Sequence, residues 1–172
     1  MHAVVSFVAQ AGLYAVAAIA VVVWLTVPRP EKVAMAVEMV VGLVAVAVLV
    51  RVAGAVHTDP RPFVQDPSLR PWFAHSADNG FPSDHTAVAA VTSFVVVRRR
   101  VVVGVGLLAI TVLIAGARVL AHVHHVQDVV AGGVIGLVAA ALGALAWWAV
   151  RDVAPVRRVS RETTSQGSRA AP

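Results

Sequence analysis

The sequence contains no cysteine, so it can form neither a disulfide bond nor a thiolate metal site. Charged residues are also scarce: they make up 13% of the 172 residues, against about 25% in a typical soluble domain. Hydrophobic residues make up 59%, and the mean hydropathy is +0.81. This composition indicates a membrane protein, and the length suits a single domain.

The few charges are mostly positive, with a net charge of +5. A basic chain can bind nucleic acid, but no motif that reads DNA or RNA is present, so we expect no nucleic-acid partner. In a membrane protein an excess of arginine instead reports topology and contact with anionic lipid. The expected partner is therefore the phospholipid bilayer.

Long apolar runs supply the elements of the fold. About 20 apolar residues cross the roughly 30 Å hydrocarbon core as a helix. Four runs have that length, and a fifth reaches a usable length if its helix starts at Ser83. We predict an all-α, polytopic membrane helix bundle with about five transmembrane helices, at about residues 3–27, 33–56, 83–97, 101–121 and 126–150.

The basic residues predict the orientation of this bundle. With five spans, ten of the 14 lie on one side: Arg29, Lys32, Arg98, Arg99, Arg100, Arg151, Arg157, Arg158, Arg161 and Arg169. The positive-inside rule places that side in the cytoplasm, so the polar loop 57–82 lies outside the plasma membrane. We expect a multi-pass membrane domain of residues 1–151, with its active site at the extracytoplasmic helix ends. Residues 152–172 are predicted to be a basic, disordered cytoplasmic tail.

Histidines gather at the predicted outer face. Six of the seven lie between residues 57 and 125: His57, His75, His85, His122, His124 and His125. Ionisable residues at a membrane edge are functional candidates by default. We therefore expect a functional site built from three segments near them, around Arg61, Ser83 and His124.

The first segment contains Arg61 followed by Pro62. The proline biases Arg61 towards an extended backbone, and a guanidinium there can bind a phosphate with two parallel hydrogen bonds. The alternative is an arginine that contacts lipid headgroups.

The second segment, Pro82-Ser83-Asp84-His85, leads into an apolar helix. Proline followed by serine and aspartate is typical of a helix start, where free N–H groups form an anion site. Capping explains Ser83 and Asp84 equally well. It does not explain His85, which can exchange a proton near neutral pH.

The third segment contains Arg118, His124 and Asp128. On a helix, the i, i+4 spacing places His124 and Asp128 on one face, so that the carboxylate fixes the imidazole tautomer and frees the other nitrogen to attack. A salt-bridged helix end is one alternative. Metal binding by His122, His124 and His125 is another, but neighbouring side chains on a helix point about 100° apart, which suits one ion poorly.

Together these segments resemble the motifs of the type 2 phosphatidic acid phosphatase superfamily. That family carries Lys-x6-Arg-Pro, Pro-Ser-Gly-His and Ser-Arg-x5-His-x3-Asp, in this order. Here the motifs read Gly54-x6-Arg61-Pro62, Pro82-Ser83-Asp84-His85 and Ala117-Arg118-x5-His124-x3-Asp128. Within the family, the second motif with Phe81 before it and Thr86 after it is similar to undecaprenyl-pyrophosphate phosphatases of the bacitracin-resistance type.

The resemblance implies a role for each matching residue. His124 is the nucleophile that forms a phosphohistidine, Asp128 orients it, and His85 is the general acid and then the general base. Arg61, Ser83 and Arg118 bind the phosphate oxygens. Fixed cations take the place of a metal, so we expect neither a metal nor a cofactor.

The chain departs from the family pattern at three positions. Gly54 carries no charge where the family has lysine, and we predict that Arg51, one turn earlier, substitutes for it. An arginine that extends to the headgroups is the alternative, and His57 is a second candidate for the role of the lysine. Ala117 lacks a hydroxyl. Asp84 brings a carboxylate to the expected phosphate-binding group, where it repels phosphate unless it binds His85 or a substrate proton.

Residues outside these motifs receive other interpretations. His75, Asp59, Asp66 and Asp78 are read as solvated loop residues, and Glu38 as a helix-interface or headgroup-directed residue. Gly132, Gly133 and Gly136 form a ridge of small residues that favours a close helix contact.

The function predicted from these features is a metal-independent lipid phosphatase, with a polyprenyl pyrophosphate as first-choice substrate and phosphatidic acid or phosphatidylglycerol phosphate as alternatives. Two other classes compete with it. A non-catalytic lipid-phosphate binder or scaffold is supported by the missing lysine, whereas a small transporter fits poorly because the polar residues lie at one face. The sequence is also compatible with a homo-oligomer.

Overall fold

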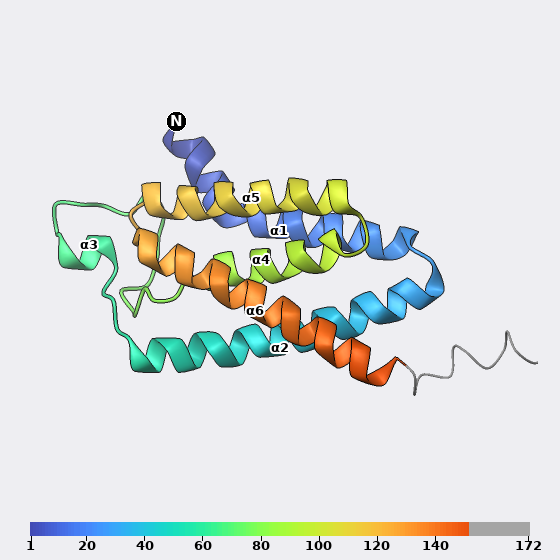
Figure 1. The fold of residues 1–172 in the computed structure, drawn as a ribbon. Helices are drawn as coiled ribbons and strands as arrows, with labels where there is room; N and C mark the ends of the chain where they lie inside the picture. Colours follow the sequence, from blue (N-terminus) through green and yellow to red (C-terminus); the bar gives the residue numbers. More distant parts are fainter. Residues whose placement is uncertain (152–172) are drawn as a thin grey trace, which may run out of the picture.

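The computed structural model describes residues 1–151, so the predicted tail 152–172 lies outside the described residues. The described part is a helical bundle (Figure 1). Its elements are α1 (His2–Thr26), α2 (Arg29–Val56), α3 (Pro62–Gln65), α4 (Asp84–Val97), α5 (Val101–Leu120) and α6 (Val126–Val150). The all-α membrane bundle predicted from the sequence is confirmed.

The helix boundaries follow local sequence signals. Pro28 precedes α2 and Pro30 occupies its first turn, where a proline without an N–H group is tolerated. Helix α2 therefore begins at Arg29, before the expected start of the second span near residue 33, and Arg29 and Lys32 lie in its first turn. The short helix α3 was not predicted; Pro62 opens it within the polar loop.

Helix α4 forms the centre of the bundle and packs against α1, α2, α5 and α6. It begins directly after Ser83, as predicted, and nine of its 14 residues are buried. Fourteen residues extend only about 21 Å, less than the roughly 30 Å of the hydrocarbon core. By length and composition four helices, α1, α2, α5 and α6, can cross a membrane, and the predicted fifth span is this shorter central helix.

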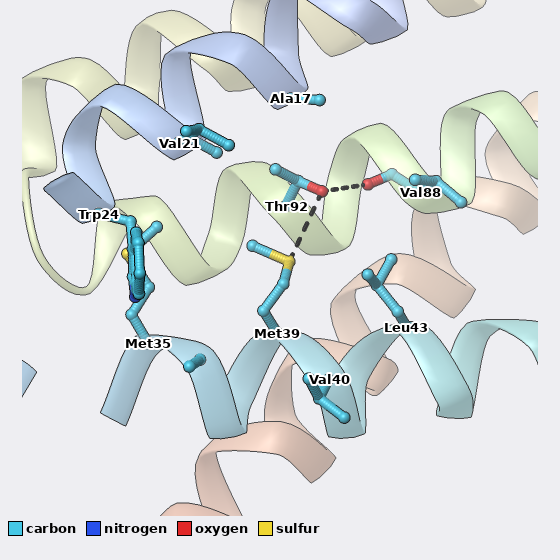
Figure 2. Close-up of a pocket in the computed structure, with 11 residues that line it drawn as sticks. Ala17, Val21, Trp24, Met35, Met39, Val40, Leu43, Val88 and Thr92 are labelled. Carbon is cyan, nitrogen blue, oxygen red and sulfur yellow. Dashed lines mark hydrogen bonds between the residues drawn. The ribbon is translucent and has the colours of Figure 1, made fainter. Parts of the chain in front are cut away.

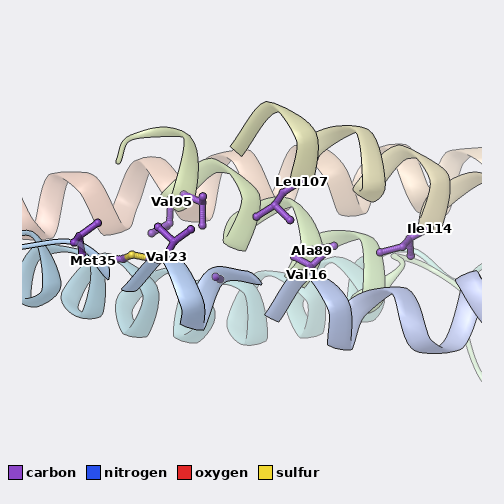
Figure 3. Close-up of a cluster of buried hydrophobic side chains, with 10 residues drawn as sticks. Val16, Val23, Met35, Ala89, Val95, Leu107 and Ile114 are labelled. Carbon is purple, nitrogen blue, oxygen red and sulfur yellow. The ribbon is translucent and has the colours of Figure 1, made fainter. Parts of the chain in front are cut away.

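Small and β-branched side chains fill the space between these helices. One cluster joins Val16 of α1, Val95 of α4 and Leu107 and Ile114 of α5, all at most 1% exposed (Figure 3). A second cluster joins Val46 of α2 to α4 and α6. Most of the large apolar side chains that remain exposed belong to the long helices, as expected for contact with lipid.

Two of the three ridge glycines allow α6 to approach α4 closely. A Cβ at Gly132 would lie 2.5 Å from the carbonyl oxygen of Ser83, and one at Gly136 would lie 2.5 Å from the Cβ of Ala90. Gly133 has open space at that position, so it takes no part in this contact. The close contact predicted from the ridge is confirmed for Gly132 and Gly136.

An apolar groove of about 360 Å³ lies between α1, α2 and α4 (Figure 2). Trp24, Met35 and Met39 are among its lining residues. The hydroxyl of Thr92 donates to the carbonyl of Val88, and the indole N–H of Trp24 donates to the carbonyl of Lys32, so neither polar group demands a polar ligand. The groove thus has the character of the lipid-facing surface.

The two ends of the bundle differ in chemistry. At one end lie the polar loop and α3, together with the first residues of α4 and α6 and the last residues of α5 (Figure 1). At the other end Glu38 is fully buried and pairs with Arg98 and Arg99. Glu38 is thus an interface residue that holds α2 to the α4–α5 connection.

Candidate active site

Two guanidinium groups from separate segments meet at one nitrogen of His124. Nη1 of Arg61, just before α3, lies 3.4 Å from Nε2 of His124, and Nη2 of Arg118, near the end of α5, lies 3.2 Å from the same atom. All three side chains are buried, with at most 6% exposed. The convergence predicted for these three residues is therefore present.

Backbone contacts fix both arginines in this position. Nη1 of Arg61 donates to the carbonyl of Val123 at 2.7 Å, and Nη1 of Arg118 donates to the carbonyl of Ala9 in α1 at 3.2 Å. Each guanidinium is thus tied to a second segment before any phosphate binds. This preorganisation reduces the cost of orienting charge around an anion.

His124 lies before α6, not within it. Helix α6 begins at Val126 and has His125 as its N-cap, so the premise that His124 and Asp128 share a helix face was wrong. The predicted contact still forms, with Nδ1 of His124 3.4 Å from Oδ2 of Asp128. It forms because Asp128 is the third residue of α6 and its carboxylate turns back to the helix start, accepting the N–H of His125 at 2.8 Å.

The surroundings of His124 favour its neutral form. Burial lowers the pKa of His124, and the nearby Arg118 and Arg61 act in the same direction, while the hydrogen bond to Asp128 opposes them. With Nδ1–H directed at Asp128, the lone pair of Nε2 faces the two guanidinium groups. That arrangement suits attack on a phosphorus atom whose oxygens the arginines bind.

The start of α4 brings Ser83 to the same region. Its N–H donates to the carbonyl of Asp128 at 3.0 Å, and its hydroxyl oxygen accepts from Thr86, which leaves the hydroxyl hydrogen of Ser83 for another acceptor. Ser83 is fully buried beneath Gly132 of α6.

A cavity of about 360 Å³ opens beside this group. His85 and Arg118 line it, together with Gln10 and Tyr14 of α1 and His75 of the polar loop. The structure therefore brings His85 to the space next to Arg118, where a group bound by that arginine would lie. The cavity is large enough for a phosphate headgroup.

Two predicted phosphate-binding residues do not join the group. Arg51 is exposed on α2 and Asp84 is exposed in the first turn of α4, and neither side chain has a hydrogen bond or ion pair within residues 1–151. Gly54 lies against the carbonyl of Phe81 and the side chain of Asn79. The assignments of Arg51 and Asp84 therefore stay predictions without a supporting contact.

Two loop residues interpreted as solvated belong to the group. Nε and Nη2 of Arg61 each lie 2.9 Å from Oδ1 of Asp78, and Nε2 of His75 lies 3.0 Å from Nη2 of Arg118. Burial raises the pKa of Asp78, but the hydrogen bonds from Arg61 and Ser76 and the positive charge of Arg61 together outweigh it, and the pKa is lowered. No spacing in the sequence pointed to either residue, because both lie in irregular backbone.

The three histidines considered as metal ligands are not grouped as such. Nδ1 of His122 lies 3.1 Å from the carbonyl oxygen of Arg70, while His124 faces the arginines. His125 pairs with Asp59 at 2.9 Å, and these two with Asp128 are the group within residues 1–151 whose spacing could hold an ion. That group is already joined by hydrogen bonds and ion pairs.

Comparison with known proteins gives three matches. The profile of the PAP2 superfamily matches residues 34–152. The bacitracin transport permease protein BcrC of Bacillus licheniformis is 29% identical over 140 residues, which cover 81% of this chain and 68% of that protein. The crystal structure of LpxE from Aquifex aeolicus has a TM-score of 0.68 at 23% identity, covering 83% of this chain and 84% of that one, and shows a shared fold.

Proposed function

Because this chain belongs to the PAP2 superfamily of membrane lipid phosphatases, we propose that it hydrolyses a polyprenyl pyrophosphate, or a related lipid phosphate, through a phosphohistidine. The observation that carries the proposal is the meeting of Arg61 and Arg118 at Nε2 of His124, with Asp128 behind the opposite ring nitrogen. A nucleophile backed by a carboxylate and faced by two fixed cations has the parts that phosphoryl transfer requires.

The first step transfers the terminal phosphoryl group to the protein. The lone pair of Nε2 of His124 attacks phosphorus, and the bond from phosphorus to the leaving oxygen breaks. His85 gives its proton to that oxygen, while Arg61, Arg118 and the hydroxyl of Ser83 bind the remaining oxygens. Asp128 stabilises the positive charge that forms on the imidazole.

The second step releases inorganic phosphate. Water attacks the phosphorus of the phosphohistidine, and His85, now unprotonated, accepts a proton from that water. The bond between phosphorus and Nε2 breaks and returns the lone pair to His124. The arginines supply the charge stabilisation in both steps, so no metal ion is required.

Two likenesses support the proposed substrate. Likeness to BcrC, whose name refers to bacitracin, agrees with the second-motif resemblance and favours a polyprenyl pyrophosphate. Phosphatidic acid and phosphatidylglycerol phosphate are the alternatives.

The distribution of arginine supports the side of the membrane. The arginine-rich end of the bundle lies opposite the site, and the positive-inside rule then directs the site to the extracytoplasmic face of the plasma membrane.

Phosphate release in detergent tests this proposal. Purified protein with EDTA is expected to release phosphate from undecaprenyl pyrophosphate, and His124→Ala to release none. Intact binding of the lipid without release by the wild type would instead favour a non-catalytic binder. Loss of release with EDTA, restored by zinc, would overturn the metal-independent mechanism.

A further inference from the structure

His75 lies in the polar loop, outside the three motifs, and contacts Arg118 of the candidate active site. Its Nε2 is 3.0 Å from Nη2 of Arg118. Its ring centroid is 6.3 Å from that of His124, with the ring planes at 81°. Arg118 Nη2 is therefore shared between His75 and the candidate nucleophile, and His75 lies within reach of any anion bound there.

The cavity beside Arg118 gives His75 access to a ligand. His75 and His85 both line this space, the first from the loop and the second from α4. Gln10 and Tyr14 of α1 lie on its lining as well. A phosphate held by Arg118 in this cavity would lie between two imidazoles, one of which the proposed mechanism already uses as the acid.

The protonation of His75 responds to charge in this space. Burial, and then the positive charge of Arg61, lowers the pKa of His75, and Arg118 adds to the effect. The neutral ring accepts from Arg118 through Nε2, while Nδ1 lies 3.4 Å from the carbonyl oxygen of Ser76. An anionic phosphate acts in the opposite direction and raises the pKa of His75, because an opposite charge within about 4–6 Å favours the protonated form.

We propose that His75 is a phosphate-binding residue of this site, which donates from protonated Nε2 to a substrate oxygen and adds a positive charge beside Arg118. The inference rests on the proposed function and extends it by one residue. It also places a cation at a site whose first motif has the uncharged Gly54, a position that contacts Phe81 and Asn79 in the structure.

A purely structural role makes the opposite prediction for two substitutions. If His75 only positions Arg118, then His75→Gln keeps function, since the glutamine oxygen can accept from the guanidinium. His75→Lys then fails, since an ammonium group cannot accept. If His75 supplies charge to a phosphate, His75→Lys retains more activity than His75→Gln.

Phosphate release from undecaprenyl pyrophosphate and inhibition by orthovanadate are measured for both variants. We expect His75→Gln to lower kcat/KM and weaken vanadate inhibition by about ten- to a hundredfold, the range of a hydrogen bond to a charged group. His75→Lys is expected to recover most of both. Asp66→Asn, which changes an exposed residue of the same loop, is the control and should keep wild-type values.

The results separate this inference from the function on which it rests. Wild-type protein that releases no phosphate refutes the proposed function. Active wild type with an unchanged His75→Gln variant, or with His75→Gln more active than His75→Lys, overturns the role of His75 alone. If His75→Lys does not elute as a folded protein, the vanadate inhibition of His75→Gln decides: a tenfold loss supports the inference and an unchanged value overturns it.

Discussion

Asp78 and Arg61 form a two-point contact at the edge of the candidate active site, with Nε and Nη2 of Arg61 both 2.9 Å from Oδ1 of Asp78. The carboxylate belongs to a side chain that is 63% exposed, whereas the guanidinium is buried and also anchored by the carbonyl of Val123. Asp78 therefore offers Arg61 a negative partner at the place where a phosphate would compete for it.

Replacing Asp78 by asparagine should tighten anion binding. Asparagine keeps an oxygen acceptor for Arg61 but removes the competing charge, and the bond to Val123 keeps the guanidinium in place. We expect the inhibition constant of orthovanadate to fall by about threefold, a modest change because the pair is partly in solvent. Asp66→Asn, at an exposed loop residue bonded to Ser68, is the control. Weaker inhibition in Asp78→Asn would show that the carboxylate orients Arg61 instead.

Asp128 makes two contacts that substitution can separate. Its carboxylate contacts His124 and also accepts the N–H of His125 at the start of α6. Asp128→Asn keeps the amide acceptor for the cap but loses the charge, so phosphate release should fall by about 10²–10⁴-fold with little change in melting temperature. Asp128→Ala should lose both activity and stability. Equal melting temperatures for the two variants would refute the capping role.

Gly132 and its neighbour Gly133 provide a matched pair. A methyl group on Gly132 would meet the carbonyl oxygen of Ser83 at 2.5 Å, whereas one on Gly133 meets nothing within 4 Å. Gly132→Ala should displace Ser83 and reduce phosphate release at least tenfold, since misplacement by about 1 Å can cost up to a hundredfold. Gly133→Ala should match the wild type. Similar activities would mean that α4 and α6 separate without cost.

The parts of this structure that could be predicted from the sequence rest on strong local patterns. Long apolar runs with few charges located the four long helices, and the Pro82-Ser83 signal located the start of α4. The convergence of Arg61, Arg118 and His124 could also be predicted, because the expected topology places all three at the same end of the bundle.

The residues that could not be predicted depend on loop geometry. His75 and Asp78 reach the arginines from irregular backbone, which has no period to read. Arg51 stays a prediction: helical spacing gave it a position near Gly54, but its exposed side chain makes no hydrogen bond or ion pair within residues 1–151. The contact between His124 and Asp128 was predicted from the wrong premise, since a capping turn produces it.

The buried carboxylate of Glu38 should be important for stability at the end of the bundle opposite the site. It pairs with Arg99, whose side chain is 10% exposed, and with Arg98, whose side chain is 46% exposed. Glu38→Ala leaves Arg99 without its buried partner and should destabilise the protein by roughly 3–5 kcal/mol. Arg99→Ala should lower the melting temperature more than Arg98→Ala, because the more exposed pair is screened by solvent. Equal effects of the two arginine variants would contradict this ranking.

The pH dependence of turnover should report His124, the proposed nucleophile. Burial lowers the pKa of His124 below its ordinary value of 6.5, so the unprotonated ring persists to lower pH than an exposed histidine would allow. The acid limb of kcat/KM, which reports the free enzyme, should therefore lie below pH 6.5. Because Asp128 raises this pKa, the residual activity of Asp128→Asn should show an acid limb at still lower pH. A wild-type acid limb at or above pH 6.5 would mean that burial does not control the pKa of His124.

The lowered pKa of His124 also makes the stability of the fold depend on pH. As the pH falls below 6.5, the unfolded chain binds a proton at His124 before the folded chain does, so the free energy of unfolding declines. His124→Gln should remove that part of the decline.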